Sequence, residues 1–340
     1  MSKELRRFGA SAMALSVLAV VGCDVQQSAA SSSLLRASAA AWKYPAASCP
    51  CVYVANSLAP SITAFVAGTH GALTPLKTVS GSSTGLNNPT AVAVDAAGNV
   101  YAANAFGRSG TITVYAAASN GNATPARTIA GPDTKLDLPA GIAVDGAGKL
   151  YVSNSEGGPD GRGSVAVYAT GADGNAAPIR SIEGAKTGLD EPGGLALDAI
   201  GNLYVPNQAG NVAVFAPGAN GNVAPVRTIG GSNTGLSVPY QVTLDVQANL
   251  YVANYGNAVT VYAAGAKGNV APTRTIAGSQ TKLDGADGIA VDASGNIHVA
   301  DYRSNAVVVF AAGSNGDVSP ARTIKGPDTK LSGPEGIAIR

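Results

Sequence analysis

The feature that most constrains this chain is a unit of about 50 residues that recurs six times. Each copy contains a short apolar segment, Leu-Tyr-Val-Ala-Asn or a close variant, and successive copies start 48, 50, 53, 47 and 47 residues apart. A repeat of roughly 20 to 50 residues is typical of solenoids, propellers and arrays, in which one unit cannot bury its apolar face alone. The six copies occupy residues 52–56, 100–104, 150–154, 203–207, 250–254 and 297–301.

A second apolar segment also occurs six times, and Asp-x-x-Gly-Asn turns such as 95–99 and 292–296 join it to the Tyr segment that follows. Glycine supplies the positive φ that the tip of a tight hairpin needs. The two segments are therefore predicted to be paired antiparallel strands. The second segment occupies residues 91–95, 141–145, 194–198, 241–245, 288–292 and 336–340.

Two more strands complete each unit. A β-branched run such as 111–115 is followed by a polar loop and then by a segment that carries one base. Six such bases could form a phosphate-binding track. We favour a simpler interpretation, in which a long charged side chain on the outermost strand protects a sheet edge from pairing. The bases are Lys77, Arg127, Arg180, Arg227, Arg274 and Arg322.

Four strands in each of six units predict an all-β fold, a six-bladed β-propeller with four antiparallel strands per blade. The repeats begin with the Tyr segment at Val52 and end with an inner strand at 336–340. The last strand therefore supplies the inner strand that the first blade lacks, and we expect the ring to close by this pairing. A solenoid, the alternative, would not need complementary ends.

The repeat resembles the NHL repeat. Residues 139–145 read Pro-Ala-Gly-Ile-Ala-Val-Asp, the Tyr segments follow the pattern Gly-Asn-Leu-Tyr-Val-Ala-Asn, and the resemblance covers roughly residues 52–340. It implies a six-bladed propeller that acts in protein or RNA binding, with lyases and lactonases among its relatives. A fold alone cannot choose among these functions.

The N-terminus has the pattern of a bacterial export signal. A basic start is followed by an apolar stretch at 8–21 that is too short for a comfortable membrane span. The sequence Val-Val-Gly-Cys ending at Cys23 resembles the lipobox of lipoprotein precursors, which implies a lipid on Cys23 and anchoring to a bacterial membrane in the cell envelope. The predicted parts are a signal peptide (1–22), a flexible Ser/Ala-rich tether (23–47) and the propeller (48–340).

The net charge gives no sign of a nucleic-acid partner, and the cysteines leave one structural question open. Without the signal peptide the chain has 19 bases and 20 acids, which gives no steering toward nucleic acid. Cys49 and Cys51 flank Pro50, and a bridge between them would close a strained ring. The sequence therefore leaves two alternatives for this pair, which are two separate thiols or one unusual local disulfide.

In this topology the residue before each inner strand lies at one mouth of the central channel. Asp287 and Glu335 occupy this position on neighbouring blades, where a carboxyl pair can hold Ca²⁺ or act in acid–base chemistry. Solvated rim charges are the simpler interpretation, and we prefer it. The six residues are Thr90, Ala140, Gly193, Tyr240, Asp287 and Glu335.

Other repeated polar residues have structural interpretations. The Asn that ends each Tyr segment, with Asp301 in the last copy, recurs in every blade, so we expect it to tie a loop to the backbone. His298 takes the place of the repeat's Tyr and His70 lies in a loop. Neither is expected at the channel axis, which disfavours a histidine metal site.

Our main functional prediction is a lipid-anchored binding scaffold for an envelope protein, peptide or glycan, without a cofactor. The candidate contacts are Tyr240, Gln241 and an insertion at 155–164 that contains Glu156 and Arg162, because loops on rigid scaffolds often carry recognition.

The alternative is a metal-dependent hydrolase, lactonase or lyase at the channel mouth. Its candidate metal ligands are Asp287, Glu335 and Asp301, and such oxygen ligands suit Ca²⁺ better than zinc.

Overall fold

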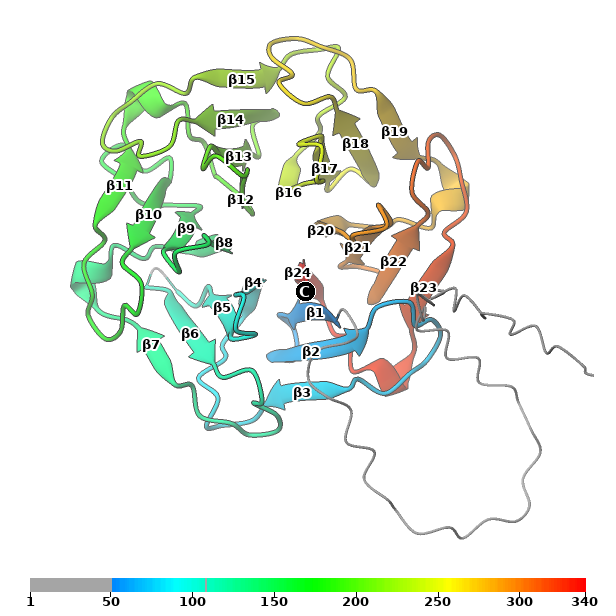
Figure 1. Cartoon of the computed structure of the whole chain (residues 1–340), viewed down its shortest axis with the longest axis horizontal. Coiled ribbons are helices and arrows are strands. Elements are labelled where there is room, and N and C mark those ends of the chain that lie inside the picture. The colour runs from blue at the N-terminus through cyan, green and yellow to red at the C-terminus, as the bar shows by residue number, and fades with distance from the viewer. Residues whose placement is uncertain (1–50, 108) are drawn as a thin grey trace, which may run out of the picture. The chain divides into compact units, whose positions relative to one another are not determined.

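The computed structural model describes residues 51–107 and 109–340. The predicted signal peptide, Cys23, the tether and Cys49 lie outside these residues. In the described part, 24 strands form six four-stranded antiparallel sheets around a central axis (Figure 1). This arrangement confirms the predicted all-β, six-bladed propeller. None of the helices in the described residues is long and apolar enough to cross a membrane.

The blades follow the chain order, except that the first blade takes its inner strand from the C-terminus. In the first blade the strands are β24 (Pro334–Ile339), β1 (Cys51–Asn56), β2 (Ser61–Val66) and β3 (Lys77–Ser80). The second contains β4 (Pro89–Val94), β5 (Val100–Asn104), β6 (Thr111–Tyr115) and β7 (Arg127–Ile129). The third contains β8 (Pro139–Val144), β9 (Leu150–Asn154), β10 (Ser164–Tyr168) and β11 (Arg180–Glu183).

The remaining three blades have the same order from inside to outside. The fourth contains β12 (Ala196–Leu197), β13 (Leu203–Asn207), β14 (Asn211–Phe215) and β15 (Arg227–Gly230). The fifth contains β16 (Pro239–Leu244), β17 (Leu250–Asn254), β18 (Ala258–Tyr262) and β19 (Arg274–Ala277), and the sixth contains β20 (Ala286–Val291), β21 (Ile297–Asp301), β22 (Ala306–Phe310) and β23 (Arg322–Lys325). Four 3₁₀ turns lie between blades: η1 (Pro132–Thr134), η2 (Ala185–Thr187), η3 (Ser279–Thr281) and η4 (Pro327–Thr329).

The C-terminal strand closes the ring. β24 pairs antiparallel with β1, and Ile337 lies opposite Val54. The Cys51 N–H donates to the Arg340 carbonyl oxygen at 2.6 Å, and the Arg340 N–H donates back at 3.1 Å. The predicted closure is therefore confirmed.

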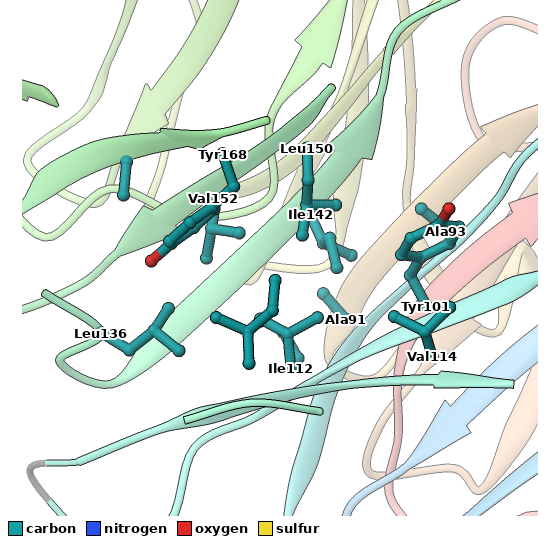
Figure 2. Packing of buried hydrophobic residues seen from close by; sticks show 13 residues of the cluster. Ala91, Ala93, Tyr101, Ile112, Val114, Leu136, Ile142, Leu150, Val152 and Tyr168 are labelled. Atoms are coloured by element: carbon teal, nitrogen blue, oxygen red, sulfur yellow. The ribbon is translucent and has the colours of Figure 1, made fainter. Parts of the chain in front are cut away.

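The core is distributed between neighbouring blades. Figure 2 shows the cluster between the second and third blades, where Ile112 and Val114 face Ile142 and Val152. These apolar and β-branched side chains stand on both faces of each sheet and suit a pleated surface buried on both sides. Every blade thus needs two neighbours to bury its faces, which explains why the repeat must form a closed ring.

The repeated bases do more than protect sheet edges, which corrects the sequence interpretation. The Arg127 guanidinium lies 5.8 Å from the centre of the Tyr101 ring and donates to the Ala172 carbonyl oxygen of the next blade at 3.0 Å. Similar Arg–Tyr pairs occur in the third, fourth and fifth blades. In the sixth blade His298 replaces the tyrosine, and its Nε2 lies 3.2 Å from Asp292 Oδ2.

Candidate functional site

Two rings of residues meet at the channel mouth. One ring begins the inner strands and contains Tyr240, Asp287 and Glu335, as predicted. The other follows the Asn that ends each Tyr strand, and sequence reasoning missed it. Its members are Ser57, Ala105, Ser155, Gln208, Tyr255 and Tyr302.

Repeated backbone contacts hold the two rings together. In each blade the residue two positions before the first-ring member has a positive φ, between 49° and 59° in five blades and 100° at Gly285. Its carbonyl accepts the N–H of the second-ring residue, for example from Tyr255 to Val238 at 3.1 Å and from Tyr302 to Gly285 at 2.9 Å. The loops that carry the site are therefore fixed by the fold before any ligand binds.

The repeated Asn has the structural role that the sequence indicated. Each Asn Oδ1 accepts a backbone N–H from the segment that leads into the inner strand, as from Ser237 to Asn254 at 3.0 Å. Asp301 does the same through Oδ2, which accepts the Asp284 N–H at 2.7 Å, while its Oδ1 accepts the Ser304 N–H at 3.2 Å. Asp301 thus anchors loops and is not among the residues that line the pocket described below.

Replacing Asn254 with Ala should leave the Ser237 N–H without its acceptor and destabilise the protein by about 1–3 kcal/mol in chemical denaturation. Asn104→Ala, which removes the same contact to Asn87 in the second blade, is the matched control. Both variants should lose similar stability, but Asn254→Ala alone should impair the site, because its loop carries Tyr255. Equal impairment by both variants would contradict this local role.

The mouth has a pocket on one side, with a volume of about 240 Å³. It occurs where the large ring members of the fourth, fifth, sixth and first blades gather, whereas the second and third blades contribute small residues such as Ala105 and Ala140. Its lining is Gln208, Val238, Tyr240, Tyr255, Asp287, Tyr302 and Glu335.

Asp287 is the most unusual group in the lining. Its side chain is only 3% exposed, and its Oδ1 has no hydrogen-bond partner. Burial and the nearby charges of Glu335 and Asp301 raise its pKa to about 8. The expectation of a solvated rim charge is therefore wrong for Asp287.

Glu335 completes a carboxyl pair. Burial raises its pKa to about 7, although a hydrogen bond from Ser57 acts in the opposite direction. Glu335 is positioned by a close approach of two blades: a Cβ at Gly288 would lie 2.2 Å from the Glu335 carbonyl oxygen, so this position requires glycine. Near neutral pH the pair holds at least one proton.

Tyr240, Tyr255 and Tyr302 form most of the remaining wall, together with Gln208 and Val238. The Tyr240 and Tyr255 ring centres are 6.4 Å apart with the rings tilted by 36°. Burial and the charges of Glu335 and Asp287 raise the pKa of Tyr240 well above its usual value. Tyr240 is therefore a protonated donor at any physiological pH. Arg303 lies over the Tyr255 ring at 4.9 Å and is not part of the lining.

The other predicted contacts lie elsewhere. The Gln241 side chain bridges inner strands, because its Oε1 accepts the Ile289 N–H at 3.2 Å and its Nε2 donates to the Ile337 carbonyl oxygen at 3.5 Å. Neither Glu156 nor Arg162 lines the pocket. Arg162 pairs at the surface with Asp190 at 3.3 Å.

The pocket fits a Ca²⁺ ion poorly. Such an ion takes roughly six to eight oxygen ligands, of which several are carboxylates. Asp287 and Glu335 are the two acids in the lining, and the described residues contain no group of three His, Cys, Asp or Glu side chains able to hold a metal.

Comparison of the sequence with protein-family models and with curated proteins finds no match. Solved structures do match the fold. A protein of unknown function from Bacteroides caccae has a TM-score of 0.60 and 11% identity, covering 86% of this chain and 99% of its own. The periplasmic gluconolactonase of Pseudomonas aeruginosa has a TM-score of 0.59 and 15% identity, covering 85% and 98%. A putative 6-phosphogluconolactonase of Bacteroides fragilis has a TM-score of 0.56 and 15% identity, covering 87% and 99%. At these identities the likeness shows the propeller fold.

Proposed function

We propose that this protein is a hydrolase of lactones or similar small esters, with its site at the channel mouth. The observation that carries the proposal is the carboxyl pair, Asp287 and Glu335, in a tyrosine-walled pocket of small-molecule size. The named activities of two structural neighbours support the same class of reaction. A broad binding surface for a protein or glycan is less well supported, because the distinctive residues converge on one pocket.

In the proposed reaction Glu335 is the general base and Asp287 is the general acid. Glu335, which loses its proton first, takes a proton from water as the water oxygen attacks the acyl carbon. Asp287, which keeps its proton to higher pH, donates that proton to the ester oxygen as the carbon–oxygen bond breaks. The product is a hydroxy acid, and the Tyr240 hydroxyl supplies a hydrogen bond to the developing oxyanion.

The lining also indicates which substrates are excluded. It contains two acids and no base, so a phosphorylated substrate would meet like charge in a desolvated site. We therefore propose an unphosphorylated substrate and a mechanism that needs no metal.

The test is hydrolysis of a panel of unphosphorylated and phosphorylated lactones by the purified protein, followed by acid release. Asp287→Asn and Glu335→Gln should each lower kcat/KM by about 100-fold or more. Asp328→Asn, which removes an exposed carboxyl from η4, should retain activity. Chelators and Asp301→Asn should change little, because Asp301 occupies the Asn position of the repeat. Inactivity of the parent on every substrate, or full activity of Asp287→Asn, would overturn the proposal; loss on chelation would restore the metal-dependent alternative.

The cellular setting rests on the sequence. We propose that the protein is exported, lipid-anchored through Cys23, and built from repeats of the NHL kind. The periplasmic location named for the Pseudomonas aeruginosa neighbour is in keeping with export.

A further inference from the structure

The composition of the pocket wall points to a charge on the ligand. Three of its seven side chains are tyrosines, two are carboxyls, and none is basic. Aromatic faces attract cations because the ring quadrupole is negative above the plane, and the attraction increases when the cation is desolvated. Carboxylates add a full opposite charge.

One of these rings already holds a cation. The Arg303 guanidinium lies 4.9 Å from the Tyr255 ring centre, closer than in the four Arg–Tyr pairs between strands, which span 5.4 to 5.9 Å. Arg303 is about half exposed and reaches Asp284 at 3.8 Å, so it lies at the rim outside the lining. The wall therefore favours cations even where solvent competes.

The buried Asp287 oxygen is the second, independent observation. Asp287 lines the pocket, the residue is 3% exposed, and its Oδ1 has no hydrogen-bond partner. A buried acceptor without a partner costs free energy unless a ligand satisfies it. With one proton on the carboxyl pair, the pocket has a net charge of −1, which matches a monocation.

We propose that the ligand of this pocket carries an ammonium group, protonated or fully methylated, which the tyrosine rings and the carboxyl pair recognise together. The inference rests on the proposed hydrolase, because it uses the same pocket, and it restricts the substrates to lactones or esters that bear an ammonium group. The volume of about 240 Å³ admits such a group on a short chain.

The first test compares choline with its neutral isostere, in which a tert-butyl group replaces the trimethylammonium. Calorimetry on the full protein should give at least about tenfold tighter binding for choline. The choline affinity should rise from about pH 6 to about pH 9, because a cation binds best to the charged carboxyls. Equal affinities for the two probes, or no binding of choline at any pH, would overturn the inference.

Variants separate recognition from folding. Tyr240→Phe keeps the ring and should retain choline binding, whereas Tyr240→Leu should lose about tenfold or more. Asp287→Asn should weaken binding, and Arg303→Ala should strengthen it, because it removes a like charge and frees a face of Tyr255. Weakening by Arg303→Ala, or equal binding by the Phe and Leu variants, would contradict cation recognition.

The two proposals fail differently. Hydrolysis of neutral lactones without selectivity for choline would reject the ammonium ligand and leave the hydrolase standing. Selective choline binding in a protein that hydrolyses no ester would do the reverse.

Discussion

A chain that ends at Glu335 should fail to unfold cooperatively and should aggregate. The deletion removes residues 336–340, most of β24, and with them the buried Ile337, half-buried Ile339 and the backbone bonds between Arg340 and Cys51. Lost burial alone is worth about 2–5 kcal/mol, a large share of the roughly 5–15 kcal/mol that stabilises a typical protein. β1 would also become an exposed apolar edge that can pair with other chains.

A circular permutant provides the control. Residues 340 and 51 can be joined by a short linker, since their backbones are hydrogen-bonded, and new ends can be opened within the exposed residues 158–162. This chain keeps all 24 strands and should unfold cooperatively, as measured by thermal and chemical denaturation. If the truncated chain were as stable as the parent, the ring would not depend on β24.

Raising the pH from about 5 to about 9 should destabilise the parent protein through its carboxyl pair. The folded-state pKa values of Asp287 and Glu335 are raised to about 8 and about 7, so the folded state binds more protons than the unfolded state above about pH 4. Their stabilising contribution is full below that pH and is lost as the pH rises through 7 and 8. One pKa unit is worth about 1.4 kcal/mol, so between about pH 5 and the Asp287 pKa of about 8 the loss for this residue alone is on the order of 4 kcal/mol.

The double variant Asp287→Asn with Glu335→Gln should have a nearly flat stability profile over this range and exceed the parent in stability at the alkaline end. Denaturation in guanidinium at several pH values measures both. Asp328→Asn, which removes an exposed acid, should follow the parent. A parent profile that stays flat from about pH 5 to about pH 9 would show that the two carboxyls are not held in their neutral forms.

The sequence predicted the fold because local and long-range patterns agree. The Asp-x-x-Gly-Asn turns fix the hairpins, since Asp95 Oδ1 accepts the backbone N–H groups of Ala97 and Asn99. The unmatched strands at the two ends then require closure, which the pairing of β24 with β1 confirms. The hairpin geometry is short-range and occurs five times, while the closure follows from the count of strands at the two ends of the repeat array.

The candidate site could be predicted only in part. When the six repeats are aligned with one another, Asp287 and Glu335 stand at a position where other repeats have small residues. This comparison of the repeats was enough to predict that both lie at one mouth of the channel. Tyr255 and Tyr302 could have been found in the same way, because they follow the repeated Asn, or Asp301 in its place, where other blades have Ser, Ala or Gln. The burial of Asp287 was beyond the sequence, since it depends on side chains from several blades that converge across the channel.

The protonation of the carboxyl pair can be measured directly by NMR titration of the parent protein with carbon-13 in its Asp and Glu carboxyls. We expect two signals with midpoints near 7 and 8, and the higher one should vanish in Asp287→Asn and the lower one in Glu335→Gln. The proposed hydrolase requires that, near neutral pH, Glu335 has lost its proton to act as the base while Asp287 keeps its proton to act as the acid. If instead every carboxyl signal titrates below about pH 5, as ordinary solvated acids do, the proposed acid–base site is wrong.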